Sequence, residues 1–327
     1  MQLFNLSRRE VVAVLAVTPL VACDKGPAIL EDADDPDPID PITSNEDHYV
    51  TSCCGTPNVE VADWKLTIFN GTTELASLDM DWLEQQDTQD KEHTLECISA
   101  SPYHHAISNA IWTGRPLQEL FDLLGVVVPD EAIEMVFTCA DGYSTSLPVS
   151  DLDKPVWLVW RMNGEALPDA HGFPVRLLVP GRYGMKNPKW IETLSFVTEP
   201  YTGFWESYGW SNEATYRANA LVRDPARTSR VRAGLLRLQG TAYAGRDPVV
   251  AVEVRVDGGE WTPAEIDYAP GPDIWTLWHF DWQGEEGMHT LQARCTTESG
   301  AMSIDDTAGS DQYSGYDGSM EIEVEVV

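Results

Sequence analysis

The chain has 327 residues, with 53 Asp and Glu against 21 Lys and Arg, which gives a formal net charge of −32 and an isoelectric point near 4.3. This charge excludes a nucleic-acid backbone as partner, because proteins that bind one concentrate Lys and Arg to neutralise the phosphates. A hydrophobic fraction of 43%, with 12 Trp and 11 Tyr, excludes a wholly disordered chain, and the length allows two domains.

Residues 1–23 have the pattern of an export signal. Arg8 and Arg9 directly precede an apolar run over 11–22, which is too short to span a bilayer. The arginine pair resembles twin-arginine signals, which carry folded proteins across a membrane. The end of the run resembles a lipobox, so we expect Cys23 to be lipidated and to anchor the protein outside the cytoplasm. The alternative is an ordinary secretory signal in which Cys23 has no role.

Residues 24–48 are rich in acidic residues and proline and have few apolar positions. Such a segment buries too little surface to offset the entropy lost on ordering. We therefore expect an acidic disordered tether between the lipid anchor and the folded body.

The stretch 49–229 predicts an α+β domain, because short apolar runs alternate with turns and a few helical segments. Residues 116–124 predict a helix that ends at Gly125. We expect one apolar face on this helix, formed by Leu117, Leu120, Leu123 and Leu124. Continuous apolar runs over 156–160 and 175–179 predict buried strands.

Residues 230–327 predict an all-β domain. Valines alternate with other residues over 250–256, and Asp257-Gly258-Gly259 is typical of a hairpin turn. Further strands are predicted over 275–282, 290–295 and 320–327. This pattern is typical of an immunoglobulin-like sandwich, and an arginine-rich link before Arg230 separates it from the first domain.

The cysteines show neither a haem-attachment motif nor zinc-ligand spacing. Cys139 and Cys295 lie in apolar runs and are predicted to be core residues. Cys53 and Cys54 are adjacent, and adjacent cysteines pair only in a strained turn, so we expect two free thiols.

Three short stretches carry candidate chemistry. Cys97 ends a short strand before a polar loop, where its thiolate can face a bound group, although a buried core cysteine is the alternative. Asp141 begins an Asp-Gly turn. The window 171–190 holds one His and four Lys or Arg but no acid, and its glycine turns can bring backbone N–H groups to an anion. The alternative for this window is a basic surface paired with acids elsewhere.

Together, and in this order, these stretches resemble the sulfite oxidase family of molybdenum enzymes. The matching motifs are a TLEC-type strand ending at Cys97, WTGRPL at 112–117, ADGYS at 140–144, HGFPVR at 171–176 and GRYGMKNPKW at 181–190. The resemblance implies a sulfite-oxidase-type molybdopterin-binding domain over 49–229. It continues into 252–261, which is similar to the family's dimerisation domain and implies a homodimer.

The resemblance also implies Mo-molybdopterin as the cofactor and a role for each matched residue. Cys97 would be the thiolate ligand of molybdenum. The residues at cofactor-contacting positions are Tyr49, Ser52, Cys53, Asp141, His171, Arg176, Asn187 and Lys189. His104 and His105 follow Cys97 and are candidate catalytic proton donors, or else they lie on a loop exposed to water.

Departures from the family concern the substrate. Ile98 and Ser99 follow Cys97 where sulfite oxidases resemble one another in having Asn and arginines, and Thr51 stands where they carry Arg. Sulfite would therefore lose its main electrostatic partners. We expect oxygen-atom transfer on a small substrate outside the cytoplasm, with electrons exchanged with an external cytochrome or quinol-linked partner. The alternatives are an S- or N-oxide reductase and a cofactor-free immunoglobulin-like binding protein.

Overall fold

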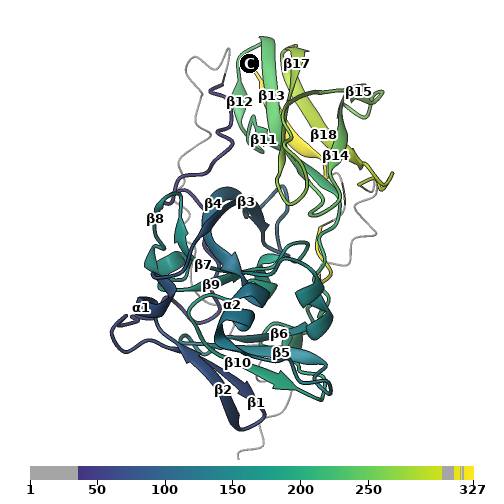
Figure 1. The fold of residues 1–327 in the computed structure, drawn as a ribbon. Coiled ribbons are helices and arrows are strands. Elements are labelled where there is room, and N and C mark those ends of the chain that lie inside the picture. The colour runs from purple at the N-terminus through teal and green to yellow at the C-terminus, as the bar shows by residue number, and fades with distance from the viewer. Residues whose placement is uncertain (1–35, 304–312, 317, 319) are drawn as a thin grey trace, which may run out of the picture.

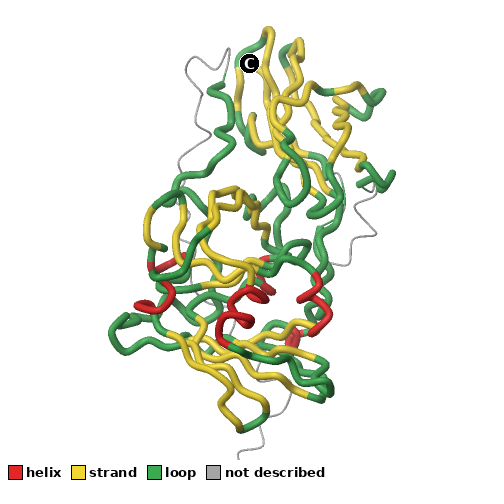
Figure 2. The backbone as a smooth tube through the Cα atoms, viewed as in Figure 1, coloured by secondary structure: helices red, strands yellow, loops and turns green. Residues whose placement is uncertain are grey.

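The computed structural model describes residues 36–303, 313–316, 318 and 320–327, which form two domains (Figure 1). Helices are short and lie in the first domain, whereas the second domain consists of strands and loops (Figure 2). The predicted export signal at 1–23 lies outside the described residues. In the part of the chain that the structure describes, no helix has the length and apolar character needed to cross a bilayer.

A mixed five-stranded sheet forms the end of the first domain that is remote from the second. Its strand order is β2-β1-β10-β5-β6, and β1 and β10 are its parallel pair. The strands are β1 (Leu66–Asn70), β2 (Thr73–Leu78), β5 (Glu134–Cys139), β6 (Ser144–Pro148) and β10 (Ile191–Val197).

A second, antiparallel sheet of the first domain has the order β3-β4-β7-β8, with β9 on the edge of β7. Its strands are β3 (Gln89–Glu96), β4 (Ile107–Pro116), β7 (Trp157–Met162), β8 (Glu165–Ala166) and β9 (Arg176–Leu178). The main core, which includes Ile68, Phe121 and Leu158, joins this sheet to the first sheet and to α2. The strands predicted over 156–160 and 175–179 are confirmed.

The helices of the first domain are α1 (Met80–Leu83) and α2 (Leu117–Leu124), with 3-10 turns at Val149–Asp153, Asp169–His171, Gly184–Lys186 and Glu206–Tyr208. Helix α2 confirms the predicted helix, and Gly125 ends it with a φ of 69°. The prediction of Leu123 on the apolar face is wrong, because its side chain is 52% exposed. Phe121, one turn after Leu117, is buried in the core.

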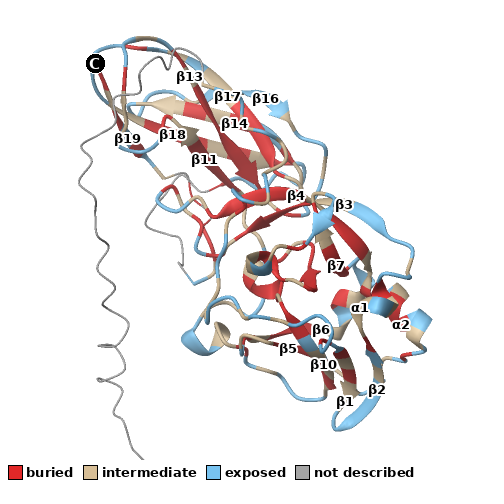
Figure 3. Cartoon of the chain, turned by 90° about the vertical axis from the view of Figure 1, so that its left-hand side faces the viewer, coloured by how far each residue is buried: buried red, intermediate tan, exposed pale blue. Residues whose placement is uncertain are grey.

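The second domain is a sandwich of two sheets, as predicted. One sheet has the order β11-β13-β17-β16 and the other β12-β19-β18-β14-β15. The first comprises β11 (Asn219–Asp224), β13 (Gly234–Tyr243), β16 (Glu265–Tyr268) and β17 (Thr276–Gly284). The second comprises β12 (Arg230–Val231), β14 (Val249–Val256), β15 (Thr262–Pro263), β18 (Gly287–Thr297) and β19 (Ile322–Val326). Buried residues from both sheets pack in one core cluster, and Figure 3 shows buried positions along the strands of the sandwich.

The predicted domain boundary at 229/230 is wrong by about one strand. Residues Asn219–Asp224 form β11, which pairs with β13, so the sandwich begins near Asn219. This arginine-rich stretch indicated a link between the domains, and its short apolar run, Ala220, Leu221 and Val222, which is buried, was overlooked.

Strand β14 departs from simple alternation at its start. Its register shifts between Val249 and Ala251, so Val249 is buried and Val250 is 54% exposed, while Val252 and Val254 face the core. The predicted turn follows: Asp257 and Gly258 both have positive φ, at 51° and 67°, and β14 pairs with β15.

Residues 36–48 pack on both domains, so the predicted disordered tether over 24–48 is wrong for this part. The carbonyl of Asp37 accepts a hydrogen bond from Gln239 Nε2 (2.9 Å), and that of Pro41 accepts one from Asn109 Nδ2 (2.8 Å). Ile39 packs against the apolar cluster between the domains, and His48 is buried. These contacts use backbone carbonyls, which composition does not reveal. Residues 24–35 lie outside the described residues.

The domains meet at the end of β3, just before Cys97. Thr94 N donates to the carbonyl of Asp273 (2.9 Å), and Thr94 accepts hydrogen bonds from Trp275 N at its hydroxyl and from Tyr243 Oη at its carbonyl. Asn219 Nδ2 donates to the buried carboxyl of Glu96 (3.1 Å). The second domain therefore fixes the strand end that carries Cys97.

Replacing Trp275 tests this interface. Its side chain is buried beside Ile107 and Tyr243, and its indole N–H donates to the carbonyl of Pro41 (3.2 Å). We expect Trp275→Ala to lower the free energy of unfolding by about 3–5 kcal/mol, because it leaves a cavity. Trp275→Phe should lower it by about 1–2 kcal/mol. Urea denaturation measures both, with Trp261→Ala on the sandwich surface as control. An equal loss in the free energy of unfolding for Trp261→Ala and Trp275→Ala would contradict a specific role of Trp275 in the domain interface.

Candidate active site

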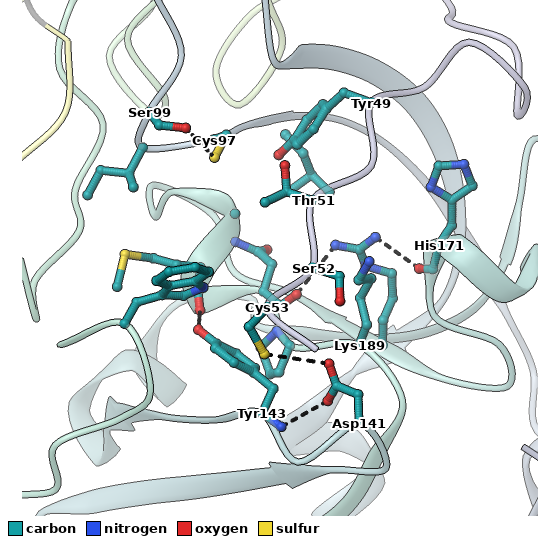
Figure 4. Close-up of a pocket in the computed structure, with 18 of the residues that line it drawn as sticks. Tyr49, Thr51, Ser52, Cys53, Cys97, Ser99, Asp141, Tyr143, His171 and Lys189 are labelled. Atoms are coloured by element: carbon teal, nitrogen blue, oxygen red, sulfur yellow. Dashed lines mark hydrogen bonds between the residues drawn. The ribbon is translucent and has the colours of Figure 1, made fainter. Parts of the chain in front are cut away.

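One cavity in the first domain brings together most of the predicted site residues. It contains about 900 Å³, part of it open to solvent. Its lining includes the predicted metal ligand and every predicted cofactor-contacting residue: Cys97, Tyr49, Ser52, Cys53, Asp141, His171, Arg176, Asn187 and Lys189. Figure 4 shows Cys97 and Ser99 on one side and His171 and Lys189 on the other, with Tyr49 and Thr51 between them in that view.

Cys97 is a free, half-buried thiol directly after β3. Its backbone is fixed on both sides: Cys97 N donates to the carbonyl of Ala106 (2.9 Å), and its own carbonyl accepts from Ala100 N (2.8 Å). Its Sγ lies 3.2 Å from Ser99 Oγ. Gly184 packs against this turn, and a Cβ there would lie 2.8 Å from Tyr49 Oη. A larger residue at Gly184 would therefore push into the cavity wall beside Cys97.

Arg176 is a buried cation without a carboxylate partner. Its guanidinium donates to the carbonyls of His171 (3.0 Å) and Asn187 (3.4 Å) and lies 4.9 Å from the centre of the Trp112 ring. Its Nε is buried with no hydrogen-bond partner. Burial lowers the pKa of Arg176 to about 10, so the group still carries its charge at neutral pH.

Lys189 is the second cation of the cavity. Its Nζ donates to the carbonyl of Ala170 (2.8 Å) and lies 4.2 Å from the centre of the Trp190 ring. No carboxylate of the described residues lies within ion-pair distance of Lys189 or Arg176. Burial, and then the charge of Arg176, lower the pKa of Lys189 to about 7. An anion bound here would raise that pKa again, because it favours the charged form.

Two neutral histidines flank these cations. His171 Nε2 donates to the carbonyl of Asn45 (2.8 Å), which leaves Nδ1 as an acceptor, and burial lowers the pKa of the ring. His48 packs edge-on against His171, with ring centres 5.1 Å apart. Burial, together with His171 and Arg176, lowers the pKa of His48 to about 3, and its Nε2 is buried without a partner.

The acid-free window divides into two parts. Arg182 forms a buried ion pair with Asp151 (2.7 Å), and Lys186 is buried against Glu206, so both have partners outside the window. Arg182 and Lys186 therefore agree with the alternative interpretation of this window, a basic surface paired with acids elsewhere. Only Arg176 and Lys189 agree with the predicted anion site.

Three predicted cofactor-contacting residues use polar atoms of their side chains in hydrogen bonds within the protein. Asn187 Oδ1 accepts from Val179 N (2.7 Å), and its Nδ2 donates to the carbonyls of Arg182 and Tyr183, so the side chain shapes the loop. Asp141 Oδ1 accepts from Tyr143 N (2.9 Å), and burial raises its pKa. Ser52 Oγ donates to the carbonyl of Gly55 (2.8 Å). Their first role is therefore to hold the walls of the cavity.

The prediction of free thiols at Cys53 and Cys54 is wrong, because the structure joins them in a disulfide. The turn at 52–55 accounts for the pairing: Ser52 Oγ accepts from the backbone N–H groups of Cys54 and Gly55, and Gly55 has a positive φ of 91°. Cys53 lines the cavity with its Sγ 3.9 Å from Asp141 Oδ2, while Cys54 is exposed.

His104 and His105 do not line the cavity. His104 lies in an exposed turn closed by reciprocal backbone hydrogen bonds with Ser101. His105 is half-buried, and its pKa is lowered to about 4 by burial and then by Arg223. Their placement agrees with the alternative of a loop outside the site and does not support a catalytic role.

Comparisons with known proteins agree with this geometry. Residues 54–205 match the family model described as oxidoreductase molybdopterin binding domain. Mouse mitochondrial sulfite oxidase is 30% identical over 190 residues, covering 50% of this chain and 35% of that protein. Chicken sulfite oxidase is 27% identical over 296 residues, covering 75% of this chain and 64% of that protein.

Among solved structures, the sulfane dehydrogenase SoxCD from Paracoccus pantotrophus has the same fold, with a TM-score of 0.76 and 22% identity. That match covers 87% of this chain and 81% of the other. Residues 54–205 therefore form a molybdopterin-binding domain that is similar to the corresponding domain of sulfite oxidases. It spans 35% to 51% of the length of the sulfite oxidases of mouse, Arabidopsis thaliana and Drosophila melanogaster.

Mo-molybdopterin is the cofactor of the domain that this family shares, and the cavity fits it. Cys97 offers a thiol, a soft ligand suited to such a metal. Arg176 and Lys189, which form no ion pair with a carboxylate of the described residues, offer two cationic groups for the phosphate. The buried, unpartnered Arg176 Nε and His48 Nε2 indicate that a polar group completes the cavity.

Sequence reasoning missed several residues of this site. His48 lines the cavity but was assigned to the tether. Its position directly before Tyr49, a predicted cofactor-contacting residue, could have indicated this role. Trp205 and Trp210 also line the cavity, from the segment that follows strand β10 and lies outside the motifs. Nothing in their local sequence points to the cavity.

The pKa of Lys189 predicts how anion binding depends on pH. In cofactor-free protein, binding of phenyl phosphate at pH 8 should take up about one proton, because the ligand restores the charge of Lys189. Above pH 7 the affinity should fall by up to about tenfold per pH unit. Titration calorimetry in buffers of different ionisation enthalpy measures the uptake. Lys189→Met should bind more weakly without proton uptake, and Lys65→Met, an exposed control, should behave as wild type. Equal uptake in Lys189→Met would exclude Lys189 as the group.

Proposed function

We propose that this protein is a molybdopterin-dependent oxidoreductase that moves an oxygen atom between water and a small substrate. The observation that carries the proposal is the sharing of one cavity by a free thiol, Cys97, and two cationic side chains, Arg176 and Lys189, that form no ion pair with a carboxylate of the described residues. When bound, the cofactor supplies two-electron redox chemistry at molybdenum. A cofactor-free binding protein would not require a free thiol and two cationic side chains in one cavity.

The protein's own residues hold and orient the cofactor in this proposal. Cys97 would bind the metal from a backbone turn that is restrained by two backbone hydrogen bonds, with Ala106 and Ala100, and by the second domain. Arg176 and Lys189 bind the phosphate, and neutral His171 presents Nδ1 as an acceptor for an N–H of the pterin. Asn187 acts through its carbonyl, which accepts from Arg176 and sets the direction of the guanidinium.

The net reaction is X + H₂O → XO + 2 H⁺ + 2 e⁻, where X is the substrate. We propose that an external electron-transfer protein accepts the electrons singly. The reverse reaction, reduction of an S- or N-oxide with electrons from such a partner, uses the same residues. A homodimer through the second domain is part of the proposal and rests on its similarity to the family's dimerisation domain.

Cys97→Ser tests the proposal. Wild-type protein matured with cofactor present should hold about one Mo per chain, since one cavity offers one thiolate ligand. Cys97→Ser should retain the pterin, which Arg176 and Lys189 hold, and lose turnover by more than about 100-fold, the upper range for groups that only support a ligand. Elemental analysis measures the Mo content, pterin fluorescence measures the retained pterin, and dye-linked assays measure turnover. Cys139→Ala, which alters a free cysteine outside the cavity, is the control. Full activity in Cys97→Ser would refute the ligand assignment.

We also propose export by the twin-arginine route and lipidation at Cys23, on the basis of the motif at Arg8 and Arg9. A double Arg8→Lys, Arg9→Lys variant should remain in the cytoplasm, because receptors for such signals read the arginine pair. Cys23→Ala should be exported but released from membranes, since it lacks the lipid. Cell fractionation with metabolic lipid labelling measures both. Membrane retention of Cys23→Ala would contradict the anchor.

A further inference from the structure

The side of the cavity next to Cys97 is apolar. Ile98 follows the metal ligand, and it packs in one cluster with Met185, Trp205 and Trp210. All four line the cavity, and Ile98 and Met185 are buried. Met185 directly follows Gly184, whose position lies against Cys97, so this cluster adjoins the metal-binding thiol.

No cation lies on this side. Among the described residues that line the cavity, the Lys and Arg side chains are Arg176 and Lys189. Lys189 lies opposite Cys97 and Ser99, as does His171, whose carbonyl accepts a hydrogen bond from Arg176 (3.0 Å) (Figure 4). The polar groups recorded beside Cys97 are neutral: Ser99 Oγ lies 3.2 Å from its Sγ, and the Tyr49 hydroxyl lies against the same Gly184 turn. Thr51 is exposed at the cavity wall.

We propose that this site takes an uncharged substrate with an apolar group beside the atom that gains or loses oxygen, such as an organic sulfide and its sulfoxide. This inference rests on the proposed function and specifies its substrate class. The balanced step is R–S–R′ + H₂O ⇌ R–S(=O)–R′ + 2 H⁺ + 2 e⁻, with the external one-electron partner accepting or supplying both electrons. A new S–O bond forms, and two O–H bonds of water break.

Desolvation explains the preference. A small dianion that entered this side would lose its water without gaining a cationic partner, which is strongly unfavourable. An apolar substituent gains by leaving water, and the faces of Trp205 and Trp210 offer it a large contact area. The phosphate of the cofactor avoids this penalty because Arg176 and Lys189 lie on its side.

The experiment compares three substrates on the holoenzyme: methyl phenyl sulfide with a dye acceptor, methyl phenyl sulfoxide with a reduced dye donor, and sulfite with a dye acceptor. We expect kcat/KM for one of the methyl phenyl compounds to exceed that for sulfite by at least about 100-fold. Titration calorimetry should also show binding of methyl phenyl sulfoxide to the oxidised holoenzyme, independently of turnover.

Two variants separate specificity from general damage. Trp210→Ala should raise KM for the methyl phenyl compound about tenfold with kcat nearly unchanged, because it removes a binding contact. Thr51→Arg places a cation at an exposed wall position and should raise kcat/KM for sulfite at least about tenfold. Trp261→Ala, on the sandwich surface, should leave all three values unchanged.

The outcomes distinguish this inference from the proposed function. A wild-type holoenzyme with a higher kcat/KM for sulfite than for both methyl phenyl compounds overturns the inference and leaves the oxidoreductase standing. Holoenzyme that neither binds nor turns over the methyl phenyl compounds overturns it too. Protein matured with cofactor present that holds neither Mo nor pterin contradicts the proposed function itself.

Discussion

The site depends on one buried charge, the guanidinium of Arg176, which no carboxylate of the described residues neutralises. Burying an unpaired cation is unfavourable, and the chain offsets this only in part, with two backbone carbonyls and the face of Trp112. The two segments that supply those carbonyls lie on either side of β9 and also carry His171 and Lys189. An anion bound there would neutralise the buried charge, so cofactor binding and the stability of these two segments are coupled.

The second domain also helps to hold the site in place. Strand β3 carries Thr94, Glu96 and then Cys97, and the sandwich hydrogen-bonds to the first two of these residues. Burial raises the pKa of Glu96 to about 8, which keeps this carboxyl neutral beside Asn219 at neutral pH. The sandwich thus restrains the end of β3 that carries Cys97, the proposed metal ligand.

The sequence predicted the local parts of this structure well and the long-range parts poorly. Motifs around Cys97, Asp141 and His171 were assigned to one site because together they resemble one family, and the structure brings all three residues to one cavity. Partners distant in sequence were invisible: Asp151 and Glu206 neutralise half of the acid-free window, and the contacts of Asp37 and Pro41 order part of the predicted tether. The Cys53–Cys54 pairing depends on hydrogen bonds to Ser52 that spacing alone does not show.

The net charge of −32 gains a specific meaning from this arrangement. Surface charges are screened over about 8 Å at physiological ionic strength, so the negative exterior acts mainly on ions that come close to the surface. Arg176 is buried and Lys189 is half-buried, and screening is weaker there. A cofactor phosphate, inserted once and retained, benefits from them throughout the life of the enzyme. A substrate must enter and leave repeatedly past an acidic surface and an apolar wall, and an uncharged molecule does so without an electrostatic barrier.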